Sequence, residues 1–233
     1  MKKFYKSVTL TEKTDNGFGL LLDNKPVQTP ARKTFFIHSL NIAKLIVKEW
    51  EGQTDKILPQ TMPVSQMAMT LIDRVIPYRE KLANEILGYI DTDLICYRTD
   101  EPIQYRRVQE EKWNPFVDWF QRKFNLSLEV TSGLSPLTQS NDIHHVIQKY
   151  ISSVNNAYFM ALYLATLGTG SIILALAFVH KDFTVDEILE ASFAEEKLKD
   201  EIYLGDIYGS APDQERKYQN LKTELETLLH FMT

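Results

Sequence analysis

The stretch Ala157–Val179, AYFMALYLATLGTGSIILALAFV, decides what kind of fold this chain can adopt. It lies inside a longer run, Tyr150–His180, that contains no Asp, Glu, Lys or Arg. About 20 such residues can cross a bilayer as a single helix. However, Gly168-Thr-Gly170 lies in the middle and can join two helices, and Asn155 and Asn156 are polar. The sequence therefore predicts two buried core helices and no stable membrane insertion; a membrane-associated subunit is the alternative.

The segments on either side of this stretch are mostly helical in pattern. From about Asp142 to the end, almost every residue fits a helix. Upstream, Arg106–Phe124 predicts a helix that Pro115 kinks or restarts. Leu126–Val130 alternates like a strand, and Thr131–Pro136 is typical of a loop.

The N-terminal part has the pattern of short antiparallel strands. Strands are predicted at Phe4–Leu10, Phe18–Leu22 and Thr34–Ile37. Turns are predicted at Asp15-Asn16-Gly17 and at Asp23-Asn24, because Asn and Gly tolerate positive φ.

Helices follow this meander. Ser39 is a plausible N-cap for the first, and Pro63 and Pro77 are each placed to open another. The helical pattern ends at Asp91-Thr-Asp93, and Leu94–Tyr97 predicts a short strand or a buried turn. We therefore predict an α+β fold, in which an N-terminal antiparallel β-meander with helices (1–130) precedes an all-helical C-terminal domain (131–233).

Composition excludes several classes of function. The chain carries 26 Lys and Arg against 31 Asp and Glu, a net charge of -5. Nucleic-acid binding is therefore disfavoured, because it usually needs a basic face. The single cysteine, Cys96, cannot form an internal disulfide, and its apolar neighbours indicate a buried structural thiol. The N-terminus shows no signal-peptide pattern, so the protein is expected to stay where it is made, unless a presequence precedes these residues.

Three carboxylates are the best candidates for chemistry. Asp73, Asp91 and Asp93 could gather around a divalent cation, which prefers hard oxygen ligands. This allows a hydrolase or metal-dependent enzyme as an alternative function. The favoured interpretation is that these residues cap the ends of helices. Adjacent His144 and His145 cannot share a metal as an i, i+4 pair would. We therefore predict no enzyme activity, no metal and no cofactor.

An acidic helical stretch near the C-terminus is a candidate docking surface. It could equally be a solvated helix face. Its acidic residues are Asp186, Glu187, Glu190, Glu195, Glu196, Asp200 and Glu201.

Three ordered groups of motifs span the chain from about Lys3 to about Gly205. The first is KFYKSV (3–8) with GF (17–18) and LDNKPVQTPA (22–31). The second is EWEGQ (49–53) with MPV (62–64) and TLIDR (70–74). The third is DTDLICYR (91–98) with EP (101–102) and WNP (113–115). In this order and spacing they resemble the ATP-twelve family, the assembly chaperones for the alpha subunit of F-type ATP synthase.

This resemblance implies a two-part fold without catalysis or cofactor. It implies a partner, the free ATP synthase alpha subunit, whose apolar subunit interface is shielded until the beta subunit replaces the chaperone. It also implies a monomer, in the cytoplasm for a bacterial member or in the mitochondrial matrix for a processed eukaryotic one. The positions that match the family are expected to form a structural network that links the domains. They are Trp50, Asp73, Arg74, Asp91, Asp93, Arg98 and Trp113.

The family further implies an acidic residue that contacts the partner. It maps onto Glu196 in Ser192-Phe-Ala-Glu-Glu196, or onto Glu195 if the register slips by one. The sequence departs from the family pattern nearby. Relatives have an aromatic-Gln pair and then Trp-Gly, where this chain has Leu198-Lys199 and Tyr203-Leu-Gly205.

Overall fold

The computed structural model describes residues 1–13, 17–133, 135–203 and 212–233. These residues form two compact units. Unit 1 comprises Met1–Arg79, Thr227–Phe231 and Thr233, and unit 2 comprises Glu80–Glu226 and Met232.

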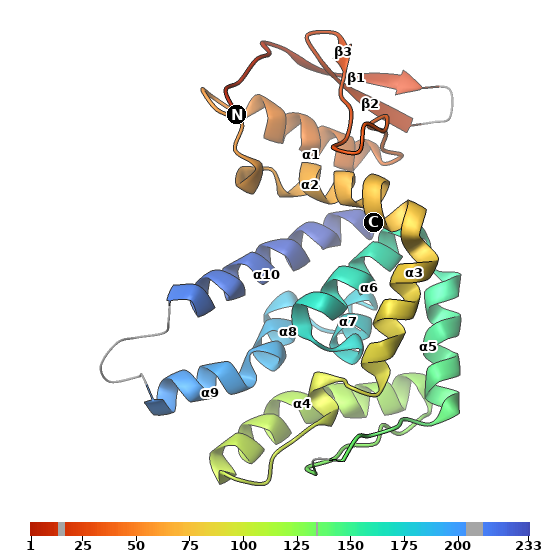
Figure 1. The fold of residues 1–233 in the computed structure, drawn as a ribbon, viewed down its shortest axis with the longest axis vertical. Coiled ribbons are helices and arrows are strands. Elements are labelled where there is room, and N and C mark those ends of the chain that lie inside the picture. The colour runs from red at the N-terminus through yellow and green to blue at the C-terminus, as the bar shows by residue number, and fades with distance from the viewer. Residues whose placement is uncertain (14–16, 134, 204–211) are drawn as a thin grey trace. The chain divides into compact units, whose positions relative to one another are not determined.

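Unit 1 is built from a small antiparallel sheet and two helical layers. Its elements are β1 (Val8–Lys13), β2 (Gly17–Leu22), β3 (Lys25–Pro26), α1 (Leu40–Glu51), the 3-10 turn η1 (Pro59–Thr61), α2 (Pro63–Thr70), the π-helical turn η2 (Leu71–Val75) and the start of α3 (Ile76–Leu87). The strand order is β1-β2-β3. Helix α1 packs on the sheet with one side and on α2 with the other, as Figure 1 shows.

The sheet confirms part of the predicted meander. β1 pairs with β2 from Val8 opposite Leu22 to Lys13 opposite Gly17. Asp23 and Asn24, both at positive φ, make the predicted turn into β3. The other predicted turn includes residues 15 and 16, which lie outside the described part of the chain. The prediction of a strand at 34–37 is wrong, because that segment makes only isolated bridges, Gln28 with Thr34 and Phe18 with Ile37.

The helices of unit 1 begin largely where their capping residues predict. The Ser39 hydroxyl accepts from the Ile42 N–H at 3.4 Å at the start of α1, and Pro63 is the first residue of α2. Pro77 lies directly before a kink in α3, because Tyr78 has non-helical torsions (φ -119°, ψ 19°) and a new helical segment follows it. The π-helical turn precedes this proline, which has no N–H for the usual helical bond.

Unit 2 is helical throughout its regular structure. Its elements are the rest of α3, the 3-10 turns η3 (Gly88–Ile90) and η4 (Leu94–Cys96), α4 (Ile103–Phe124), α5 (Asn141–Ser153), α6 (Asn156–Thr169), α7 (Ile172–Val179), α8 (Val185–Ser192), α9 (Ala194–Tyr203) and α10 (Pro212–Phe231) as far as Glu226. Helix α4 packs against α7, α8 and α9. The units therefore divide at Arg79/Glu80, which differs from the boundary at 130/131 that the sequence predicts.

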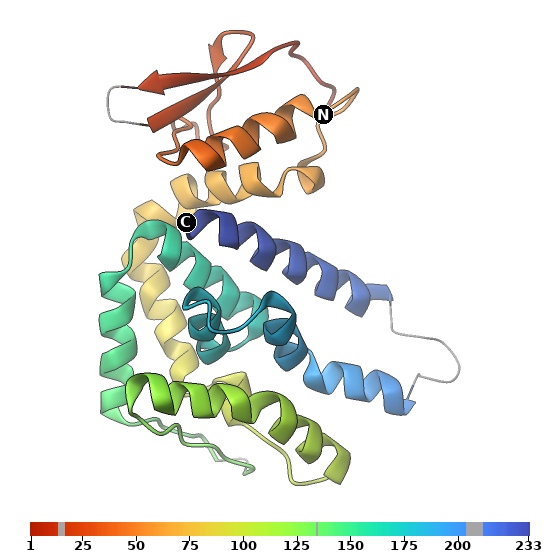
Figure 2. The ribbon, with the colours of Figure 1, turned by 180° about the vertical axis from the view of Figure 1, so that it is seen from behind.

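The apolar stretch forms two buried helices, as predicted. Helix α6 ends at Thr169, Gly170 takes the left-handed conformation (φ 72°), and Ser171 caps α7 through its hydroxyl. Every residue of α7 is buried, and Figure 2 shows α6 and α7 side by side within unit 2. Among the helices of the described residues, none has both the length and the apolar character needed to cross a membrane.

Two further predictions in unit 2 need correction. Pro115 lies inside α4, so the helix does not restart there, and the alternative of a kink at Pro115 stays a prediction. Residues 126–130 form no strand, because the Gln139 side chain bonds both the N–H and the carbonyl oxygen of Glu129. Residues 94–96 make the buried turn η4, one of the two alternatives. The α+β class itself is confirmed, with a small antiparallel sheet followed by helices.

Candidate protein-binding site

Asp93 is a fully buried carboxylate that caps two elements of unit 2. Its Oδ1 accepts from the N–H of Ile95 at 3.2 Å, at the start of η4. Its Oδ2 accepts from the N–H of Ile173 at 3.0 Å, in the first turn of α7. Free N–H groups at helix starts favour a carboxylate there. The predicted capping role is therefore what the geometry shows for Asp93.

Burial outweighs these bonds in setting the charge of Asp93. Loss of water raises the pKa of its carboxyl from an ordinary 3.8 to about 6, although the bonds from Ser171, Ile173, Ile95 and Ile172 lower it. The folded protein thus holds a proton at Asp93 more tightly than the unfolded chain does. Its contribution to stability is fully present below pH 3.8 and is lost as the pH rises through about 6.

Asp93→Asn removes this titration. The displacement from 3.8 to about 6 corresponds to about 3 kcal/mol. We expect the free energy of unfolding of Asp93→Asn, minus that of the wild type, to rise by about 2 to 3 kcal/mol between about pH 4 and about pH 7.5, because part of the full effect is already lost at pH 4. Urea denaturation at several pH values measures this difference. Any effect of the asparagine on stability that does not depend on pH is the same at each pH, so it does not alter the expected rise.

Asp182→Asn is the control for this experiment. Hydrogen bonds from Trp119 and Lys123 lower the pKa of Asp182, so its titration lies below pH 3.8. The free energy of unfolding of Asp182→Asn, minus that of the wild type, should stay constant between about pH 4 and about pH 7.5. A level difference for Asp93→Asn as well would contradict the raised pKa.

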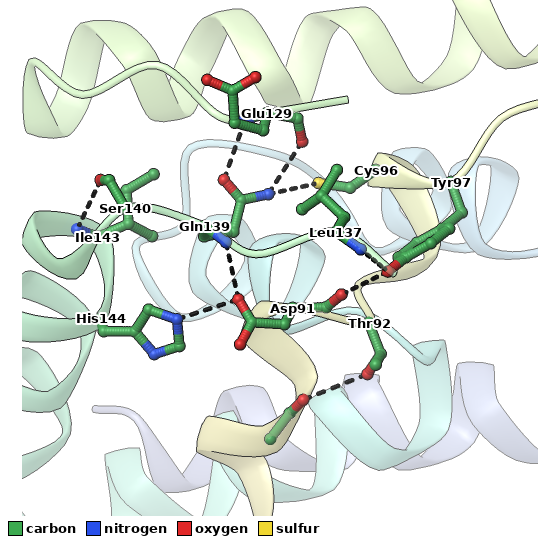
Figure 3. Close-up of polar contacts among 11 residues, drawn as sticks. Asp91, Thr92, Cys96, Tyr97, Glu129, Leu137, Gln139, Ser140, Ile143 and His144 are labelled. Atoms are coloured by element: carbon green, nitrogen blue, oxygen red, sulfur yellow. Dashed lines mark hydrogen bonds and ion pairs between the residues drawn. The ribbon is translucent and has the colours of Figure 1, made fainter. Parts of the chain in front are cut away.

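Asp91 belongs to a polar network that holds the irregular segment before α5. Its Oδ1 accepts from the Gln139 N–H at 2.8 Å and lies 3.0 Å from His144 Nε2 (Figure 3). The Tyr97 hydroxyl donates to the Asp91 carbonyl oxygen and accepts from the N–H of Leu137. These bonds connect the turn after α3 to the residues that lead into α5, so Asp91 has a structural position.

Arg98 and Trp113 meet beside this turn. The Arg98 Nε donates to the Ile95 carbonyl oxygen, and its Nη1 donates to Asn114 Oδ1 at 2.5 Å. Arg98 therefore forms no hydrogen bond with Asp91 or Asp93. The Arg98 guanidinium lies 6.0 Å from the Trp113 ring, whose Nε1 donates to the Ala191 carbonyl oxygen in α8.

The remaining matched positions, Trp50, Asp73 and Arg74, lie in unit 1. The carboxylate of Asp73 accepts from the Thr29 hydroxyl at 2.6 Å and from the Ala31 N–H at 3.0 Å. Trp50 is buried and packs against Tyr5, whose hydroxyl donates to the Trp50 carbonyl oxygen. The predicted network residues thus fall in both units, and its role as a link between domains stays a prediction.

The alternative of a metal-dependent enzyme requires the three carboxylates to converge. Within residues 1–13, 17–133, 135–203 and 212–233, no three His, Cys, Asp or Glu residues are placed to hold a metal ion. Each of Asp73, Asp91 and Asp93 is instead occupied by N–H or hydroxyl donors of its own unit or by His144. Cys96 is buried, and burial raises the pKa of its thiol, as expected for a structural cysteine.

The two candidate partner-binding residues differ in their surroundings. Both belong to the first turn of α9. Glu195 is half-buried and accepts a hydrogen bond from Gln109 Nε2 of α4. Glu196 is exposed, and it forms no hydrogen bond or ion pair with any other described residue. Glu196 is therefore available to a partner, while Glu195 already joins α9 to α4.

Glu196 lies at a groove of about 540 Å³ in unit 2, which we call the α6–α10 groove. The end of α6, the junction of α8 and α9, and α10 form its walls. Its lining residues are Leu94, Leu167, Gly168, Thr169, Gly170, Ser192, Phe193, Glu196, Lys217, Asn220, Leu221 and Glu224. A Cβ on Gly168 would overlap Leu221 Cδ1, so the glycine lets α10 approach α6 closely.

Lys217 and Glu224 are groove residues that the sequence did not single out. Their helix has the pattern of an ordinary amphipathic segment, and only tertiary packing places them in the same groove as Glu196. The contact that could have indicated this is Gly168 with Leu221, but nothing in the sequence pairs these two positions.

Comparison with known proteins shows the family and the fold of the chain. The profile of the ATP12 chaperone protein family matches residues 2–121, just over half of the chain. The crystal structure of Atp12 from Paracoccus denitrificans has a TM-score of 0.87 and 25% sequence identity, covering 99% of this chain and 97% of that one. The crystal structure of the Atu1473 protein from Agrobacterium tumefaciens has a TM-score of 0.84 and 27% identity, covering 99% and 85%. The chain therefore belongs to the ATP12 chaperone protein family.

Proposed function

We propose that this protein is an assembly chaperone that binds the free alpha subunit of F-type ATP synthase. It shields the subunit interface of alpha until the beta subunit takes its place, and it catalyses no reaction. The observation that carries this proposal is the family match over residues 2–121, together with a fold shared with Atp12 over nearly the whole chain. A bare subunit interface is apolar and prone to aggregate, so covering it is useful in itself.

Co-purification tests the proposal directly. The immobilised protein is incubated with free alpha subunit, washed, and then challenged with beta subunit. We expect capture of alpha and its release as an alpha–beta complex. Failure to capture folded, monomeric alpha would remove the support for this function.

Glu196→Ala is expected to weaken alpha binding while leaving the fold intact. Glu196 is exposed and unpaired among the described residues, so its removal costs the folded state little. A charged residue at the solvent-exposed edge of a protein–protein interface typically affects the association rate and the dependence of that rate on salt. The measurement pairs a circular dichroism spectrum with the dissociation constant for alpha.

Glu195→Ala provides the matched comparison on the same helical turn. It breaks the hydrogen bond to Gln109 and should lower the free energy of unfolding by about 1 kcal/mol. If Glu195→Ala weakens alpha binding and Glu196→Ala does not, the partner-binding role belongs to Glu195.

A further inference from the structure

The α6–α10 groove carries negative charge that the fold itself does not use. Among the described residues, the carboxylates of Glu196 and Glu224 form no hydrogen bond or ion pair, and neither does the Lys217 amine. Lys217 lines the same groove but forms no ion pair with either carboxylate. Helix α6 ends in the groove at Thr169, and the carboxyl end of a helix carries partial negative charge. A positive group entering the groove would be attracted from more than one side.

Glu224 stands out because it is half-buried without a partner. Burial raises the pKa of its carboxyl, which means that its charge costs the folded state free energy. A glutamine of the same shape would not carry this cost. Charged groups that destabilise a fold are typical of binding sites, where the ligand supplies the missing partner.

The apolar part of the groove restricts what this partner can be. Leu94, Leu167 and Leu221 line it alongside the two carboxylates. Lysine and arginine side chains combine an apolar stem with a cationic head, so they match such a lining. The groove volume, about 540 Å³, is in the range of sites that enclose a ligand group.

We propose that the α6–α10 groove receives a lysine or arginine side chain of the client, whose cationic head lies between Glu196 and Glu224 and whose stem packs on the leucines. This inference rests on the proposed function, because the client is the free alpha subunit. It adds a second contact residue, Glu224 on α10, and the chemistry of the client segment. Binding gives the half-buried Glu224 carboxylate a partner, so part of the interaction relieves a cost of the free chaperone.

Glu224→Gln tests the proposal in the full-length protein. We expect the dissociation constant for free alpha to increase about tenfold, with a weaker dependence on salt. The thermal midpoint of the variant should be equal to or higher than that of the wild type, because the glutamine removes a buried charge. Glu226→Gln is the matched control, since it makes the same change on the same helix at an exposed residue outside the groove. It should bind alpha as the wild type does.

Thiol labelling reports on the groove independently of charge. Cys96 is buried and stays unreactive, so a cysteine placed at the exposed groove residue Asn220 is the single labelled site. Maleimide should modify Asn220→Cys rapidly in the free chaperone and slowly in the alpha complex, as measured on the chaperone by mass spectrometry. Gln219→Cys, outside the groove lining, should react at the same rate in both states.

The outcomes separate this inference from the proposed function. If the wild type captures alpha but Glu224→Gln binds equally well and Asn220→Cys reacts equally fast, the groove proposal is wrong and the chaperone function stands. Concentration-dependent protection of Asn220→Cys without alpha would show that a second copy of this chain fills the groove, which also overturns the proposal. If the wild type does not capture alpha, both the chaperone function and the groove proposal are overturned.

Discussion

Trp113→Ala is expected to lower the free energy of unfolding by about 3–5 kcal/mol, because it removes a large aromatic side chain from the core of unit 2. Trp113 is 1% exposed. Its Nε1 donates at 2.8 Å to the carbonyl oxygen of Ala191, one of the carbonyls at the end of α8 that lack a partner within the helix. The substitution therefore leaves a cavity and an unsatisfied carbonyl at once. Urea denaturation measures the loss.

Trp113→Phe separates the two parts of this effect. Phenylalanine retains most of the packing but cannot donate to Ala191, so we expect a loss of about 1–3 kcal/mol. Hydrogen exchange should speed up first in α4 and α8, which the indole joins. An Ala variant as stable as the Phe variant would show that packing of the ring contributes nothing.

Trp50→Ala should cost about 3–5 kcal/mol and abolish the folding of unit 1. The ring is 7% exposed and packs against Tyr5 with 5.6 Å between ring centroids. Its position at the end of α1 places it where the helix meets the N-terminal segment. Circular dichroism and hydrogen exchange of residues 1–79 test this expectation. A well-folded Trp50→Ala protein would overturn its role as a core anchor.

Trp50→Phe makes a comparison with Trp113→Phe possible. The Trp50 Nε1 is buried and has no hydrogen-bond partner in the described part of the chain. Its loss therefore breaks no bond, and Trp50→Phe should cost less than Trp113→Phe. The reverse order would mean that the Trp50 indole has an acceptor that the geometry does not show.

The parts of the fold that the sequence predicts correctly depend on local patterns. Ser39 and Pro63 mark helix starts, and the Gly168–Gly170 segment divides the apolar stretch, because each acts through its own backbone. The prediction of a strand at Leu126–Val130 is wrong because the outcome depends on a contact that is not local. The alternation of this segment suits a strand, but a side chain ten residues later, Gln139, takes the hydrogen bonds that a neighbouring strand would need.

The candidate site also contains features that local sequence patterns cannot predict. Glu196 could be named from the resemblance to a family, and its exposure is consistent with a partner-binding role that stays a proposal. Glu224 could not be named, because its importance depends on burial without a partner, and burial follows from tertiary packing. Asp93 was expected to cap a helix, but its contact with α7 joins residues 80 positions apart.

Unit 1 is assembled from segments that lie far apart in the sequence, since it combines Met1–Arg79 with Thr227–Phe231. A ribosome synthesises the N-terminal portion first, and continuous domains can fold as they emerge. This unit cannot complete its packing in that way, because Thr227–Phe231 are translated long after Arg79. We therefore expect its final packing to wait until Thr227–Phe231 have left the ribosome, and a nonsense mutation before Thr227 to harm the N-terminal sheet and helices that were made long before it.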